Sequence, residues 1–173
     1  FDWFVHLPFN ADKITALTEW EKTQASRLGI NPYKVEVIPN GVNFERYAKT
    51  RQDYFKKIGL DGKTLLFVGQ PARRKGWNYF LGAMPYILRE FPNSNAVFIG
   101  YRQSHEIKNM CEKLGISDSV KFLGFLPEEE KISAYKSADI FVFPTLYEGF
   151  GVIFLEAMAS GLPIVTTDVA GNK

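Results

Sequence analysis

Residues 140–166, IFVFPTLYEGFGVIFLEAMASGLPIVT, contain the pattern that decides the fold. An apolar, β-favouring run at 140–143 leads into a glycine-flanked loop, a helical segment at 152–160 and a second apolar run at 164–166. Gly161 and Pro163 end the helix, because glycine accepts a left-handed backbone and proline cannot continue the helical hydrogen bonds. A buried strand, a helix and another buried strand in this order indicate a parallel βαβ unit.

The same alternation of strands and helices extends upstream to residue 65. Strands are predicted at 65–68, 96–99, 120–122, 140–143 and 164–166. Helices are predicted around 80–91, where Pro85 should kink or interrupt the helix, around 107–114, ended by Gly115, and around 128–137, opened by acidic residues. The sequence therefore predicts an α/β fold, a Rossmann-like parallel sheet with helices on both faces.

The first third of the chain has a different organisation. A strand is predicted at 14–17, a polar helix at 19–28 and a second strand at 35–38, followed by an Asn-Gly turn signal. The polar stretch 42–62 reads as a link between two units. Because the chain opens on Phe1 without a methionine and stops just after an apolar run, we expect a fragment that is incomplete at both ends.

Composition excludes several classes of protein. A chain of 173 residues, 46% of them hydrophobic, supports one buried core and an appendage. The formal net charge of +2 is too small for a nucleic-acid-binding surface. Cys111 is the single cysteine and no Cys/His spacing suggests a metal site, which favours a reducing, cytoplasmic setting. No apolar run approaches the roughly 20 residues that cross a bilayer.

The first candidate site follows the first strand of the predicted sheet, where ligands of parallel sheets bind. Residues 69–76 read GQPARRKG, so that Arg73, Arg74 and Lys75 are consecutive cations just before a helix. Together with the free N–H groups of a helix start, these cations could clamp a diphosphate. A basic run is more often simply solvated. Its position at the end of a strand makes the two interpretations about equal.

The second candidate site follows the fourth strand. Glu148 lies in a loop with Gly149 and Gly151, and Glu156 lies eight residues further on, within the next helix. A carboxylate accepts two directed hydrogen bonds, which suits neighbouring hydroxyls of a ribose or a hexose. Each acid alone is more often a surface or capping residue. Their joint placement around a glycine-flanked loop favours two contacts with separate parts of an elongated ligand.

These residues resemble a known family. The stretch EGFGVIFLEAMASGLPIV, starting at Glu148, resembles the E-x7-E signature of retaining glycosyltransferases of the GT-B fold, family 4, also described as glycosyl transferases group 1. VIPNGVN at 37–43 resembles the interdomain hinge of that family, VGQPARRKG at 68–76 its phosphate-binding loop, and VKFLGFLP at 120–127 its nucleobase-binding turn. The resemblance starts near Lys13 and continues to the end of the chain.

The resemblance implies two catalytic residues, Lys75 and Glu148. Lys75 would neutralise the departing diphosphate, and Glu148 would contact hydroxyls of the donor sugar. Glu156 would bind the ribose hydroxyls, and Phe125 would meet the base. The implied donor-binding set is Gly69, Gln70, Arg73, Arg74, Lys75, Phe125, Leu126, Thr145, Glu148, Gly149, Phe150, Gly151, Val152 and Glu156.

One position departs from the family pattern. Gln70 stands where the family commonly has an arginine, so one diphosphate cation is absent. We expect Arg73 or Arg74 to replace it, or diphosphate binding to be weaker. His6 and His105 have no place in the pattern and are interpreted as structural, because a lone histidine is seldom a ligand or a base.

The resemblance also implies an activity and a domain organisation. Residues 1–41 would be a remnant of the N-terminal, acceptor-side lobe, 42–62 the interdomain linker, and 63–173 a truncated nucleotide-sugar-binding lobe. The intact protein would move a hexose from a UDP- or GDP-linked sugar to a hydroxyl of a sugar, glycan or lipid-linked acceptor, with retention of configuration. No cofactor or metal is implied, because the nucleotide sugar is a substrate. This fragment alone should bind donor and transfer little.

Other functions stay open. A non-catalytic regulatory module that binds a nucleotide sugar would show the same residues. Glycoside hydrolysis fits less well, because its two acids flank a single bond about 5–10 Å apart. The aromatic residues Phe1, Trp3, Phe4 and Phe9 suggest either the core of a truncated lobe or peripheral contact of the intact enzyme with the cytoplasmic membrane face.

Overall fold

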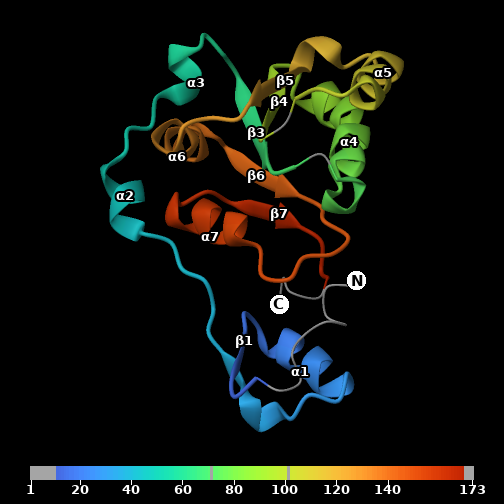
Figure 1. Ribbon diagram of the computed structural model, residues 1–173. Helices are drawn as coiled ribbons and strands as arrows, with labels where there is room; N and C mark the ends of the chain where they lie inside the picture. Colours follow the sequence, from blue (N-terminus) through green and yellow to red (C-terminus); the bar gives the residue numbers. More distant parts are fainter. Residues whose placement is uncertain (1–10, 71, 101, 170–173) are drawn as a thin grey trace.

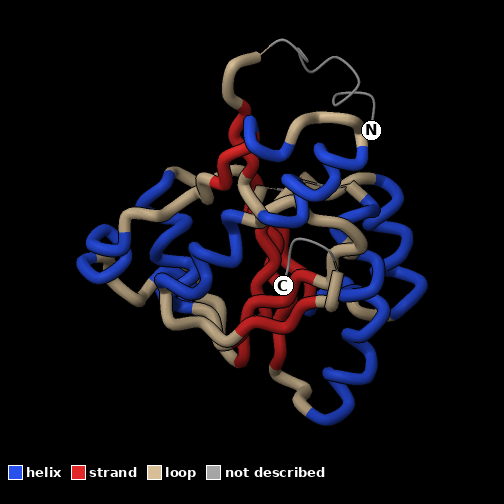
Figure 2. Tube along the Cα trace, turned by 90° about the horizontal axis from the view of Figure 1, so that it is seen from below, coloured by secondary structure: helices blue, strands red, loops and turns tan. Residues whose placement is uncertain are grey.

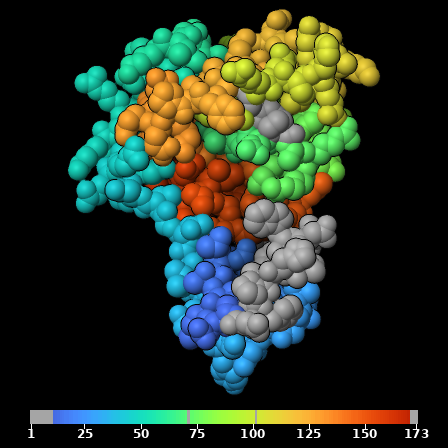
Figure 3. Space-filling model, in the orientation of Figure 1, coloured from blue at the N-terminus to red at the C-terminus, as the bar shows by residue number. Residues whose placement is uncertain are grey.

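The computed structural model describes residues 11–70, 72–100 and 102–169, which form a small unit and a large α/β unit (Figure 1). The small unit contains β1 (Ile14–Ala16), α1 (Glu19–Arg27) and β2 (Val35–Val37). The two strands pair in parallel, and Val35 and Ile30 are buried between sheet and helix. Figure 3 shows this unit as a narrower lobe beneath the large one. His6 and the aromatic residues Phe1, Trp3, Phe4 and Phe9 lie outside the described residues.

The large unit is built on a parallel sheet, as the sequence predicts. Within the described ranges this sheet has five strands in the order β5-β4-β3-β6-β7. Its central strand buries Leu66 and Phe67 completely, as expected for a strand covered on both faces. The strand bounds are β3 (Lys63–Val68), β4 (Ser94–Ile99), β5 (Val120–Gly124), β6 (Ile140–Phe143) and β7 (Ile164–Thr166).

The strand order creates a switch point in the middle of the sheet. From β3 the chain adds β4 and then β5 on one side, and it afterwards crosses back to add β6 and β7 on the other side. The loops that follow β3 and β6 therefore run in opposite directions and leave a crevice at the carboxyl ends of these strands. Parallel sheets bind their ligands in such a crevice.

Helices cover both faces of the sheet, which confirms the predicted fold class (Figure 2). One face carries α4 (Trp77–Glu90) and α5 (His105–Leu114), and the other carries α6 (Glu128–Ser137) and α7 (Val152–Ala159). Gly115 ends α5 in a left-handed conformation, as predicted. In the described part of the chain no helix combines the length and the apolar character that a membrane span requires.

Helix α4 is continuous through Pro85, so the interruption that proline favours does not occur. Proline inside a helix removes one backbone hydrogen bond, at a cost of about 3 kcal/mol. The buried face of α4, with Phe80, Leu81 and Met84 at most 2% exposed, offsets that cost through apolar contact with the sheet.

The segment 42–62, predicted as a linker, contains two short helices, α2 (Phe44–Lys49) and α3 (Tyr54–Lys57). Each buries an aromatic ring, Tyr47 and Phe55 respectively. Lys136 on α6 fixes the segment, because its Nζ donates to the carbonyl oxygen of Tyr47 at 2.8 Å and of Thr50 at 2.6 Å. This part of the chain is therefore packed on the large unit. The domain boundaries at 41/42 and 62/63 stay a prediction.

Candidate functional site

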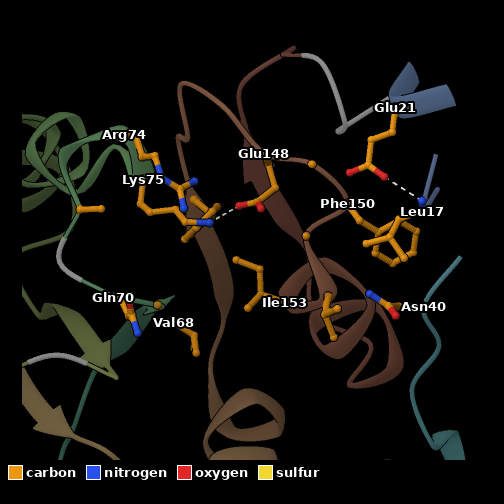
Figure 4. A pocket seen from close by; sticks show the side chains of 16 residues that line it. Leu17, Glu21, Asn40, Val68, Gln70, Arg74, Lys75, Glu148, Phe150 and Ile153 are labelled. Carbon is orange, nitrogen blue, oxygen red and sulfur yellow. Dashed lines mark hydrogen bonds and ion pairs between the residues drawn. The ribbon is translucent and has the colours of Figure 1, made fainter. Parts of the chain in front are cut away.

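A cavity of about 480 Å³ lies at the carboxyl ends of β3 and β6, at the switch point of the sheet (Figure 4). This volume is in the range of small-molecule sites. Nine of the predicted donor-binding residues line it: Gly69, Gln70, Arg74, Lys75, Glu148, Gly149, Phe150, Gly151 and Val152. The sequence thus brings the loop after β3 and the loop after β6 to one cavity.

Two predicted catalytic residues face each other across this cavity. The ammonium of Lys75 and the carboxylate of Glu148 form an ion pair, and their side chains are only 15% and 14% exposed. Lys75 Nζ also lies 5.3 Å from the ring centroid of Phe143, within the range of a cation–π contact. Since water is largely excluded, this pair interacts more strongly than an ion pair on the surface would.

The two loops can approach because glycine occupies position 76. Gly76 has a φ of 78°, and a Cβ atom there would lie 1.8 Å from the carbonyl oxygen of Pro144. Thr145 joins the loops directly, because its Oγ1 donates to the carbonyl oxygen of Arg74 at 3.0 Å. Thr145 is fully buried and does not line the cavity, so the structure gives this predicted binding residue a role in holding the loops together.

Of the two arginines expected to replace the cation missing at Gln70, only Arg74 lines the cavity. Arg74 Nη1 donates to the carbonyl oxygen of Tyr147 at 3.3 Å. Arg73 instead forms an ion pair with Glu106 on α5, and its side chain is 79% exposed. The geometry therefore favours Arg74 as the second cation of the site.

The loop after β6 leads directly into the N-terminus of α7. Gly151 begins the helix with a φ of 70°, and a Cβ atom there would lie 2.5 Å from the ring of Phe154. Glycine brings no capping side chain, and Val152 and Ile153, the first residues of α7, line the cavity. Helix N-termini carry unsatisfied N–H groups and a partial positive charge, which suit a phosphate.

Glu156 does not line the cavity. It lies one turn beyond Val152 and Ile153 on α7 and is only 8% exposed. Lys131 Nζ on α6 contacts Glu156 Oε1 at 2.8 Å. Burial raises the pKa of the nearby Tyr47 hydroxyl, and the negative charge of Glu156 adds to this effect. The sequence gives no sign of this contact, because Lys131 is one lysine after three acidic residues at a predicted helix start.

The residues expected at the nucleobase also lie outside the cavity lining. Phe125 follows β5 and is 75% exposed, whereas Leu126 packs partly buried against the core. Neither contacts the cavity in this structure. His105 begins α5 and does not line the cavity either.

Three lining residues from the small unit were not predicted: Leu17, Glu21 and Asn40. Glu21 Oε2 accepts a hydrogen bond from the backbone N–H of Leu17 at 2.7 Å, and Thr18 caps the same helix. The Thr18-x-x-Glu21 pattern signals a helix start, and nothing in it points to a cavity. Among the described residues, no cluster of His, Cys, Asp or Glu could hold a metal ion.

A Rossmann-like sheet with a cationic, glycine-rich cavity at its switch point, next to a second small unit, defines one lobe of a GT-B glycosyltransferase. The chain belongs to the glycosyl transferases group 1 family, whose sequence profile matches residues 50–173. This match confirms the family resemblance, and the stretches at 68–76, at 120–127 and from Glu148 onward lie within it, whereas the stretch at 37–43 lies outside the matched residues.

Relatives and solved structures agree with this assignment. An uncharacterized glycosyltransferase of Methanocaldococcus jannaschii is 38% identical over 146 residues, covering 80% of this chain and 37% of that protein. The phosphatidyl-myo-inositol mannosyltransferase of Mycobacterium tuberculosis is 33% identical over 135 residues, covering 76% of this chain and 34% of that protein. The chain thus spans about a third of the length of these relatives.

Solved structures share the fold over nearly the whole chain. Sucrose-phosphate synthase of Thermosynechococcus elongatus superposes with a TM-score of 0.82 at 26% identity, covering 95% of this chain and 42% of that one. HepE of Anabaena, solved with UDP and glucose, superposes with a TM-score of 0.83 at 21% identity, covering 94% and 46%. At that identity the second likeness shows the fold alone.

Proposed function

We propose that this chain is the donor-binding part of a glycosyltransferase that moves a hexose from a UDP- or GDP-linked sugar to an acceptor hydroxyl with retention of configuration. The observation that carries the proposal is the contact between Lys75 and Glu148. In a nucleotide sugar the hexose is attached directly to the diphosphate. A cation for the phosphate and a carboxylate for sugar hydroxyls must therefore lie next to each other, as these two side chains do.

Three positive groups serve the diphosphate in this proposal. Lys75 and Arg74 line the cavity, and the N-terminus of α7 opens onto it. The bond that breaks joins the anomeric carbon to the diphosphate, so negative charge grows on the departing oxygen. Fixed positive groups, among them the mostly buried Lys75, stabilise that charge in the transition state. The role needs no metal ion, because these groups already supply positive charge.

Glu148 and Glu156 divide the rest of the donor between them. Glu148, at the cavity, would accept hydrogen bonds from hexose hydroxyls, and Glu156, one turn into α7, would accept them from the ribose. That HepE is solved in complex with UDP and with UDP-glucose supports a nucleotide-sugar donor for a protein of this fold.

The acceptor would enter from the side of the small unit, which contributes Leu17, Glu21 and Asn40 to the cavity. A sugar, glycan or lipid-linked acceptor is part of the proposal, supported by a relative named as a phosphatidyl-myo-inositol mannosyltransferase. A cytoplasmic location, with contact of the intact enzyme with the membrane face, is also proposed. The buried free thiol of Cys111 supports a reducing setting.

Calorimetric titration with UDP-, GDP- and ADP-sugars tests the donor assignment. We expect one base to bind well above the others, and binding by none of them would overturn the proposal. The alternative, a regulatory module, predicts the same binding without turnover. An assay of transfer to acceptor by the intact protein separates the two, since an enzyme consumes the bound donor and a regulatory module returns it unchanged.

A further inference from the structure

Lys131 connects α6 to α7, the helix whose first residues, Val152 and Ile153, line the cavity. Its Nζ lies 2.8 Å from Glu156 Oε1 on α7 and 3.0 Å from Glu128 Oε2 on its own helix, α6. The side chains of Lys131 and Glu156 are 20% and 11% exposed, so most of their contact is shielded from water. This is the one ion pair that Glu156 makes in the described part of the chain.

The other groups around Glu156 do not neutralise it. From α6 it faces Tyr135, a fully buried residue, and Glu128 is joined to it only through Lys131. From α2 it faces Tyr47, which is also buried. Burial raises the pKa of the Tyr135 hydroxyl, and the charge of Glu156 raises it further, so that both tyrosines stay neutral. A buried carboxylate requires a compensating charge, and Lys131 supplies it.

The pair also fixes the direction of the carboxylate. Two vicinal ribose hydroxyls can both bond to a carboxylate only when its plane has one orientation. The salt bridge from Lys131 Nζ to Oε1 restrains the Glu156 side chain. Val152 and Ile153, one turn earlier on α7, line the cavity. The proposed ribose contact therefore requires a ligand that reaches one turn along α7.

We propose that Lys131 is a positioning residue that holds Glu156 in the orientation needed for the ribose diol, and so sets how strongly nucleotide binding depends on the ribose hydroxyls. The inference rests on the proposed contact of Glu156 with ribose. It assigns a function to a side chain from a neighbouring helix that touches neither sugar nor phosphate.

The test measures how much the affinity for a nucleotide depends on its ribose hydroxyls, and not the affinity alone. UDP, GDP and their 2′,3′-dideoxy derivatives are titrated calorimetrically into the 173-residue chain, and the affinity ratio between each nucleotide and its dideoxy form is recorded. For the wild type we expect a ratio of about 10 to 100, because hydrogen bonds to a charged carboxylate are lost. Lys131→Met should reduce it to about 3 or less, whereas Lys131→Arg should retain most of it.

Two further variants keep the test informative. Glu128→Gln removes the other partner of Lys131 and should leave the ratio unchanged. Lys131→Met combined with Glu156→Gln removes both buried charges, which preserves folding if the single Lys131→Met variant unfolds, and should show the same low ratio.

The outcomes separate the two hypotheses. If Glu156→Gln keeps the wild-type ratio, or if neither nucleotide binds, the proposed ribose contact fails and the role of Lys131 fails with it. If Glu156→Gln lowers the ratio while Lys131→Met keeps it, the role of Lys131 is overturned and the proposed function stands. A general loss of stability would weaken the nucleotide and its dideoxy form equally and leave the ratio unchanged.

Discussion

Lys75 and Glu148 neutralise each other inside the candidate donor site, as an ion pair that joins the loops after β3 and β6. The two residues are 73 positions apart in the sequence, and both are mostly withdrawn from water. A donor must therefore compete with Glu148 for the ammonium of Lys75, because its diphosphate carries the same sign of charge as the carboxylate. The affinity for a nucleoside diphosphate should therefore depend on the charge of Glu148, and binding experiments can measure that dependence.

Glu148→Gln should strengthen binding of free UDP or GDP. The substitution frees Lys75 and removes a negative charge beside the diphosphate, which should raise the affinity about 3- to 10-fold. The nucleotide sugar should gain less, because it loses the carboxylate contact with its hexose. Calorimetry on both ligands checks the prediction, with Glu90→Gln, an exposed site near the amino-terminal ends of β3 and β4, as the control. Equal weakening of both ligands would contradict it.

Arg74→Ala should lower the affinity for a nucleoside diphosphate about 10-fold, whereas Arg73→Ala should change that affinity less than about 2-fold. Both substitutions remove one positive charge from the same turn, so the comparison isolates position from net charge. Arg74 lines the cavity, whereas Arg73 is paired with Glu106 at the surface. Titrations at two salt concentrations provide the measurement. If both variants lose affinity equally, binding depends only on the total charge of the turn and not on which arginine lines the cavity.

Gly76→Ala should destabilise the fold by about 3 kcal/mol or more, because it combines a left-handed backbone with a clash against Pro144. Gly115→Ala is the matched control. Gly115 has a φ of 66° but open space around its Cβ position, so only backbone strain of about 1–2 kcal/mol is expected. Urea unfolding of the two variants gives the difference. If the two variants lose similar stability, the loops after β3 and β6 can move apart enough to relieve the clash with Pro144.

Asp139→Ala should destabilise the protein by about 1 kcal/mol at neutral pH and by less in acid. Burial alone would raise the pKa of Asp139, but hydrogen bonds from Lys63 Nζ and the Thr64 N–H, each 2.8 Å long, outweigh it and lower the pKa. A carboxyl whose pKa is lower in the folded state stabilises the fold above its unfolded pKa, about 3.9. The contribution is lost as the pH falls through the folded pKa.

Urea unfolding of wild type and Asp139→Ala at pH 7 and at pH 3 measures that contribution. The difference between the two proteins should be smaller at pH 3. The exposed Asp118→Ala, outside these contacts, should lose little stability at either pH. A difference for Asp139→Ala that stays the same at both pH values would show that its ionisation does not stabilise the junction of β3 and β6.

Much of the fold follows from local patterns in the sequence. The runs at 140–143 and 164–166 became β6 and β7 with the predicted bounds. The apolar run of β6 is mostly buried, as expected for a strand covered on both faces. The second run was expected to be buried too, but β7 is an edge strand of the sheet and Val165 is 50% exposed. The two short helices of the segment 42–62 were not predicted. They have six and four residues, too few for a visible helical period, and are held by tertiary contacts such as those of Lys136.

By itself, the sequence determined which segments form the sheet and which loops face its carboxyl edge, since hydrophobic period and glycine placement are local properties. Only the tertiary structure decided the pairings, Lys75 with Glu148 and Lys131 with Glu156, and the exclusion of Arg73 from the cavity. The physical reason is the order of the strands. β3 and β6 are neighbours although two other strands separate them in the chain, and the contact of Lys75 with Glu148 depends on that adjacency. The contact of Lys131 with Glu156 depends instead on the packing of α6 against α7.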